Sequence, residues 1–151
     1  MLSKLNNLLS SIIPPSPDAS RPQHTLQLAL AVLLIEVMRS DAESAAEEQA
    51  AVLDILRKRF NLSDTEVAQL SVRAHQAALG ANDLRQFTTI INRELPVPER
   101  IEIVEYLWQV AYADGKISAH ENHLMRRLVD LLHIPHGDNI AAKMRVQGGA
   151  E

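Results

Sequence analysis

Residues 111–121, with the sequence AYADGKISAHE, decide how this chain folds. A strongly apolar helical pattern ends at Asp114-Gly115, a dipeptide typical of turns. Ser118 followed by Glu121 is a capping box, which predicts the start of a second helix. The stretch therefore predicts two helices joined by a short loop with a carboxylate at each end.

The same layout recurs about 73 residues upstream, in residues 37–48 with the sequence VMRSDAESAAEE. Asp41 corresponds to Asp114, and Glu48 corresponds to Glu121, with the same separation of seven residues. We interpret the chain as a diverged internal duplication whose halves pack with pseudo-twofold symmetry.

The remaining patterns predict an all-α fold of about seven helices. Further capping boxes begin at Ser44 and Ser63, and Pro98 fits the first turn of another helix. Sustained apolar and polar alternation, which would indicate strands, is absent from the sequence. Residues 25–39 are nearly all apolar, as expected of a central helix buried on most sides. The expected core places residues of this helix against a later one: Leu33, Leu34 and Val37 against Leu107, Val110 and Ala111.

We predict a folded domain over residues 24–146, preceded by an amphipathic segment with a proline-rich linker (1–23) and followed by a flexible tail (147–151). The segment at 1–13, MLSKLNNLLSSII, fits a helix that packs on the domain or on a partner protein. Peripheral contact with a membrane surface is a second interpretation. A secretion signal is disfavoured because polar residues interrupt the apolar ones.

Composition excludes several classes of function. The net charge of −4 with no basic run argues against a nucleic acid partner. The absence of cysteine excludes disulfides and thiolate zinc sites and is compatible with a reducing compartment. No apolar run approaches the roughly 20 residues that span a bilayer, so we expect a soluble, cytoplasmic protein. No nucleophile elbow, P-loop or dinucleotide fingerprint is present, and we expect no enzymatic activity.

The duplicated carboxylates are the candidate site. If the two loops meet, Asp41, Glu48, Asp114 and Glu121 converge, and such a cluster requires protonation, basic partners or a cation. Clustered oxygen ligands suit Ca²⁺, Mg²⁺ or Mn²⁺. The alternative is that these residues only make turns and helix caps.

Glu36 is a weaker addition to this metal site. It interrupts an apolar helix and needs a partner there, which Arg39, a histidine or a shared metal would supply. His120 and His123 are three residues apart rather than the four of a zinc-protease helix, so a zinc site is disfavoured.

Three stretches carry a family resemblance: LLIEVMRSDAESAAEE, LRKRFNLSDTE and EYLWQVAYADGKISAHENHLMRRLVDLLHIPH. Over residues 26–146 they resemble the TerB-like family, which is associated with tellurite resistance and bacterial stress response. The resemblance implies an all-helical domain of about seven helices with grouped acidic residues as a metal site. Ala42 departs from the motif, which has Gly115 in the second copy.

Two functions follow as hypotheses. The first is a non-enzymatic stress protein that binds a divalent cation and passes the bound state to a partner. The second is a protein interaction scaffold, acting on another protein or on a second copy, whose acidic loops are purely structural. Acid and base catalysis by paired carboxylates is a third, weaker interpretation.

Overall fold

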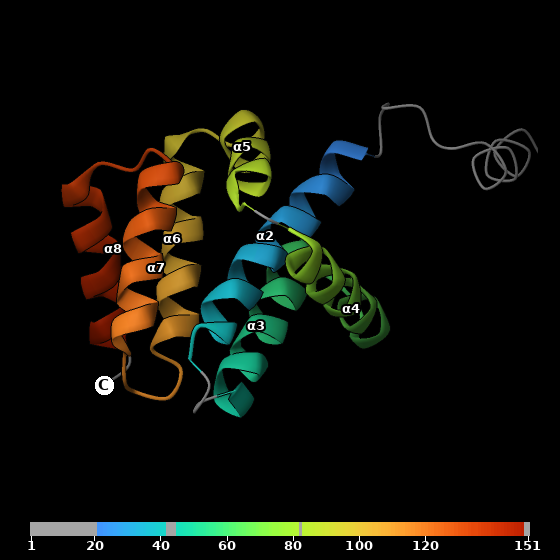
Figure 1. The fold of residues 1–151 in the computed structure, drawn as a ribbon, viewed down its shortest axis with the longest axis horizontal. Helices are drawn as coiled ribbons and strands as arrows, with labels where there is room; N and C mark the ends of the chain where they lie inside the picture. Colours follow the sequence, from blue (N-terminus) through green and yellow to red (C-terminus); the bar gives the residue numbers. More distant parts are fainter. Residues whose placement is uncertain (1–20, 42–44, 82, 150–151) are drawn as a thin grey trace, which may run out of the picture.

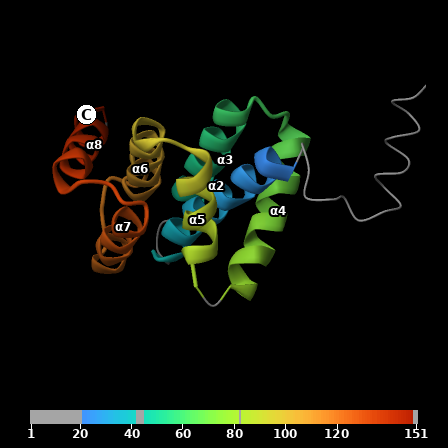
Figure 2. The ribbon, with the colours of Figure 1, turned by 90° about the horizontal axis from the view of Figure 1, so that it is seen from above.

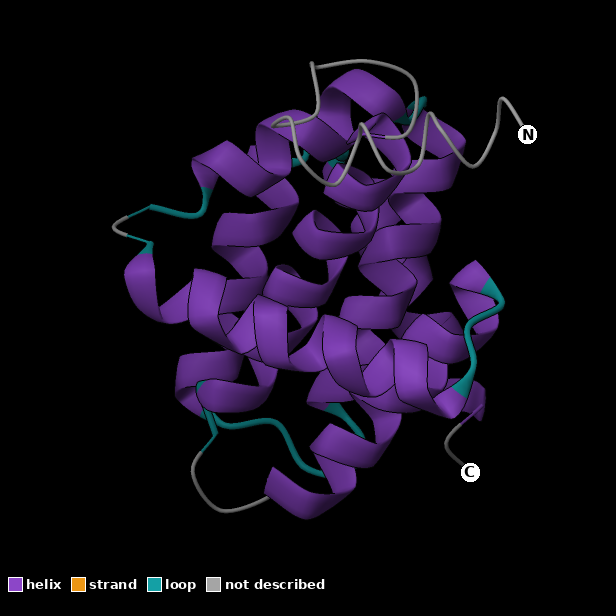
Figure 3. Ribbon diagram, turned by 90° about the vertical axis from the view of Figure 1, so that its right-hand side faces the viewer, coloured by secondary structure: helices purple, strands orange, loops and turns teal. Residues whose placement is uncertain are grey.

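The structure is a computed structural model that describes residues 21–41, 45–81 and 83–149. Figure 3 shows only helices and loops in this part of the chain. The predicted all-α fold of about seven helices is confirmed. The helices are α2 (Arg21–Arg39), α3 (Ala45–Phe60), α4 (Asp64–Gly80), α5 (Arg85–Glu94), α6 (Val97–Ala111), α7 (Ala119–Leu131) and α8 (His136–Gly149).

Helix α2 is the central element of the fold. It packs against α3, α4, α5 and α6, while α8 packs on α6 at the edge of the molecule. Figures 1 and 2 show α6, α7 and α8 grouped on one side and α3 and α4 on the other, with α2 connecting the groups. A single aliphatic core therefore extends through both groups.

The prediction that residues 25–39 form a buried helix is confirmed for its central part. From Ala29 to Val37 every side chain except Glu36 is fully buried. The six predicted core residues are also fully buried in this core, and α2 packs against α6. Burying so many aliphatic side chains is the main stabilising contribution to such a domain.

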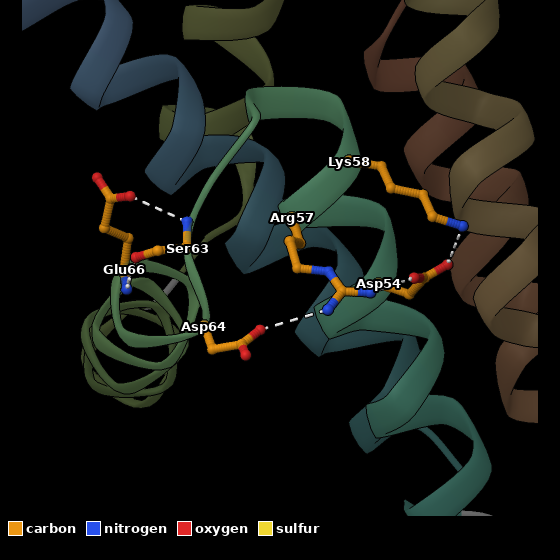
Figure 4. A network of polar contacts seen from close by, with 6 residues as sticks. All are labelled: Asp54, Arg57, Lys58, Ser63, Asp64 and Glu66. Carbon is orange, nitrogen blue, oxygen red and sulfur yellow. Dashed lines mark hydrogen bonds and ion pairs between the residues drawn. The ribbon is translucent and has the colours of Figure 1, made fainter.

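Two of the three predicted capping boxes are observed. Ser63 and Glu66 exchange hydrogen bonds of 2.9 and 3.1 Å at the start of α4, as Figure 4 shows. Ser118 and Glu121 do the same at the start of α7, with both bonds at 3.1 Å. The third predicted box begins at Ser44, which lies outside the described residues.

Both ends of the helical region extend further than the sequence predicted. Helix α2 begins at Arg21, inside the predicted linker, where Pro22 falls in a first turn that does not need its amide hydrogen. Helix α8 continues to Gly149, inside the predicted tail, and Gln147 near its end donates a hydrogen bond to the Tyr112 hydroxyl. The amphipathic segment at 1–13 lies outside the described residues.

Within the described ranges, no helix combines the length and apolar character needed to cross a membrane. The pseudo-twofold relation between the halves stays a prediction.

Candidate metal centre

The predicted acidic residues come from elements that end or begin at one side of the molecule. Asp41 follows α2, Glu48 lies in the first turn of α3, and Glu121 lies in the first turn of α7. In Figure 1 the end of α2 and the loop between α6 and α7 both lie at the lower edge. One carboxylate oxygen from each of these three residues lies within 4.8 Å of the others.

Glu121 divides its two oxygens between two roles. Its Oε1 accepts the hydrogen bond from the Ser118 amide that completes the capping box, at 3.1 Å. Its Oε2 is buried and has no hydrogen-bond partner among the described residues. A helix-cap role and membership of the carboxylate cluster are alternatives in the sequence analysis, but Glu121 has both.

Glu48 has no such cap role. Its neighbour Glu47 occupies the position that the predicted capping box requires, and Glu47 is exposed. Glu48 itself is fully buried, and within the described chain neither of its oxygens has a hydrogen-bond partner. An unpartnered buried carboxylate is costly, so this residue requires a proton or a cation.

The electrostatics of the cluster follow from this burial. Burial raises the pKa of Glu48 to about 10, and the neighbouring Glu121 carboxyl and the charges of Asp41 and Asp114 act in the same direction. Burial also raises the pKa of Glu121, although the contact with Glu48 and the Ser118 amide oppose the shift. In the cation-free chain the buried pair therefore retains a proton at neutral pH.

The other two predicted residues lie outside the group of three. Asp114 uses Oδ1 to accept a hydrogen bond from the Lys116 amide at 3.0 Å, although its charge still raises the pKa of both buried glutamates. Glu36 forms an ion pair with Arg39 at 2.9 Å, one of the partners that the sequence offered. Whether Asp114 and Glu36 contribute to a metal site stays a prediction.

The geometry of Asp41, Glu48 and Glu121 suits a single hard cation. Calcium binds oxygen ligands at about 2.3–2.6 Å, so two ligands on opposite sides of one ion lie about 5 Å apart. The observed limit of 4.8 Å lets one ion contact all three carboxylates with little movement of the chain. All the donors are oxygens, which favours calcium, magnesium or manganese over zinc or copper.

Comparison with known families agrees with this architecture. The sequence profile of the family described as Tellurite resistance protein TerB matches residues 27–144. The chain belongs to the TerB family. No curated protein and no solved structure matches the chain. The TerB region extends from α2 into α8 and contains all three clustered carboxylates.

Proposed function

We propose that this TerB domain binds one divalent cation, Ca²⁺, Mg²⁺ or Mn²⁺, through Asp41, Glu48 and Glu121. The observation that carries the proposal is the pair of fully buried glutamates, whose carboxyl groups contact each other and hold three oxygen atoms to which no other described residue donates a hydrogen bond. A group of exposed acidic residues would not support it, because such groups are common without a metal.

A divalent cation would stabilise the buried pair more than a single proton does. A single proton on Glu48 relieves repulsion with Glu121 but leaves the charge of Asp41 beside the pair. A divalent cation would neutralise two carboxylates and supply a ligand contact for each unpartnered oxygen. Binding would therefore displace the proton and stabilise the native state.

The position of the site gives the cation a role in the fold. Asp41 and Glu48 flank the connection from α2 to α3, whereas Glu121 belongs to α7. A bound cation would tie these two parts of the domain together. We propose that this tie makes the domain a cytoplasmic, non-enzymatic cation-dependent module that passes its bound state to a partner protein. Its connection with tellurite or stress rests on the family alone.

Thermal unfolding under defined cation conditions tests the proposal. The full chain is stripped with a chelator, and its melting temperature is measured with millimolar Ca²⁺, Mg²⁺, Mn²⁺ or Zn²⁺. A cation at about 100 times its Kd adds about 2.7 kcal/mol of stability, which raises the melting temperature by several degrees.

A matched pair of variants locates the effect. Glu121→Gln keeps an oxygen for the Ser118 amide but removes a carboxylate from the cluster, so it should abolish the shift while the domain remains folded. Glu47→Gln makes the same chemical change on an exposed neighbour of Glu48 and should leave the shift intact. No shift with any cation would overturn the proposal and leave the acidic loops with a structural role.

A further inference from the structure

An apolar groove lies far from the carboxylates, between the first half of α2 and the beginning of α4. Its volume is about 690 Å³. Leu62, Ala68 and Val72 contribute apolar surface to its lining. Polar and charged side chains also line it: Gln27, Gln69, Glu66 and Arg73. Figure 4 shows the ion pairs of Arg57 and the Ser63 capping box, which fix the corner between α3 and α4. Glu66 of this capping box also lines the groove.

The groove continues into an exposed apolar stripe on α4. Ala68 and Val72 line the groove, and Leu79 lies two turns further along the same helix face, with the polar His75 and Gln76 between Val72 and Leu79. Val72 is 57% exposed and Leu79 is 72% exposed, although most large aliphatic side chains of the domain are buried. An apolar helix face of this kind is typical of a surface that another helix covers.

The sequence contains a segment whose pattern matches that surface. Leu2, Leu5, Leu9 and Ile12 follow a spacing of three, four and three residues, which places them on one face of a helix. A helix over residues 2–13 would be about 16 Å long, and the stripe from Ala68 to Leu79 covers the same number of residues and the same length. The two apolar faces are therefore matched in length.

The connection between the segment and the groove is long enough. Residues 14–20 precede α2, include three prolines and span about 22 Å when extended. The groove residue Gln27 is six residues into α2 from Arg21, which corresponds to about 9 Å along the helix axis. The linker can thus return the segment to the groove of its own chain.

We propose that residues 2–13 form a helix that docks, in the same chain, on the groove and the apolar stripe of α4. The short linker favours this occupant over a second copy, because it holds the segment at a local concentration of about millimolar. Docking would bury Val72 and Leu79, the two most exposed large aliphatic side chains of α4. This docking does not depend on the proposed cation site.

Disulfide trapping in the full chain tests the docking, because the chain contains no cysteine of its own. Leu5→Cys and Leu9→Cys are combined, one at a time, with Val72→Cys and oxidised at micromolar protein. We expect a disulfide-linked monomer for at least one pair. The control combines Leu9→Cys with Gln109→Cys, an exposed position on α6, and should cross-link at least ten times more slowly.

Each other outcome overturns the proposal. Disulfide-linked dimers would show that a second copy occupies the groove. Cross-linking no faster than in the control would show that the segment does not dock on α4. If the full chain then sediments with vesicles of phosphatidylcholine and phosphatidylglycerol, the segment binds a membrane surface instead. In the trapped pair, Leu79→Glu should reduce the rate of disulfide formation several-fold, and an unchanged rate would also contradict docking along this stripe.

Discussion

The buried glutamate Glu48 gives the most discriminating prediction, which concerns the variant Glu48→Gln in the absence of cations. Burial and the nearby carboxylates of Glu121, Asp41 and Asp114 raise the pKa of Glu48 to about 10 from 4.5. The native state therefore keeps a proton that the unfolded chain has lost at pH 7. Stability from this group is fully present below pH 4.5 and decreases as the pH rises toward 10.

The magnitude follows from the shift. Between the unfolded pKa and pH 7 there are about 2.5 pH units at about 1.4 kcal/mol each. At pH 7, ionisation of Glu48 in the unfolded chain therefore lowers the free energy of unfolding by about 3 kcal/mol. A glutamine has the same shape, does not ionise, and can donate an amide hydrogen to the unpartnered Oε2 of Glu121. Glu48→Gln should therefore raise the melting temperature in chelator at pH 7 by roughly 5–10 °C.

The assay is thermal unfolding of the wild type and the variant in chelator from pH 5 to pH 8. The stability advantage of Glu48→Gln should grow by about 1.4 kcal/mol per pH unit, whereas the cation response should disappear. Glu47→Gln, which changes an exposed neighbour, should follow the wild type. A Glu48→Gln protein that is less stable than the wild type at pH 8 would refute the reasoning, because the buried carboxylate would then be a net stabilising charge.

Two further predictions concern the backbone at the ends of helices. Gly115 has a φ of 84°, and nothing lies within 4 Å of an added Cβ. Gly115→Ala should therefore lower the free energy of unfolding, measured in urea, by about 1 kcal/mol through backbone strain alone. Gly115→Asn should recover part of this loss, because asparagine tolerates a positive φ better than alanine does. The half-buried Arg100 donates hydrogen bonds of 3.1 and 2.6 Å to the carbonyl oxygens of Leu95 and Leu132. Arg100→Ala should therefore lower the free energy of unfolding by about 2–3 kcal/mol. The control, Arg93→Ala on the exposed surface, should change it by less than about 0.5 kcal/mol.

Much of the fold could be predicted from sequence because its determinants are local. The Ser63 and Ser118 capping boxes join residues three positions apart, and the apolar run of α2 is continuous along the chain. The patterns therefore gave the helices to within a few residues, with the larger errors at the start of α2 and the end of α8. At the end of α8, Gln147 contacts Tyr112, 35 residues earlier in the chain, and such a contact is not visible to local patterns.

The candidate site was only partly predictable, because its chemistry depends on contacts between residues 73 positions apart. The repeated spacing identified Asp41, Glu48 and Glu121, which the structure brings together. Asp114 instead accepts a hydrogen bond from the Lys116 amide, and Glu36 pairs with Arg39, one of the partners that the sequence analysis named.

The sequence by itself determined the helical class, the starts of α4 and α7 and the presence of paired acidic residues, because periodicity and capping act over three or four residues. Only the tertiary structure decided which carboxylates lose contact with water. Packing of α3 and α7 around the central helices buries Glu48 and Glu121 completely, whereas Asp41 remains partly exposed. That difference in burial sets the pKa values of the buried pair and makes these residues, rather than the other acids of the chain, the candidate ligands.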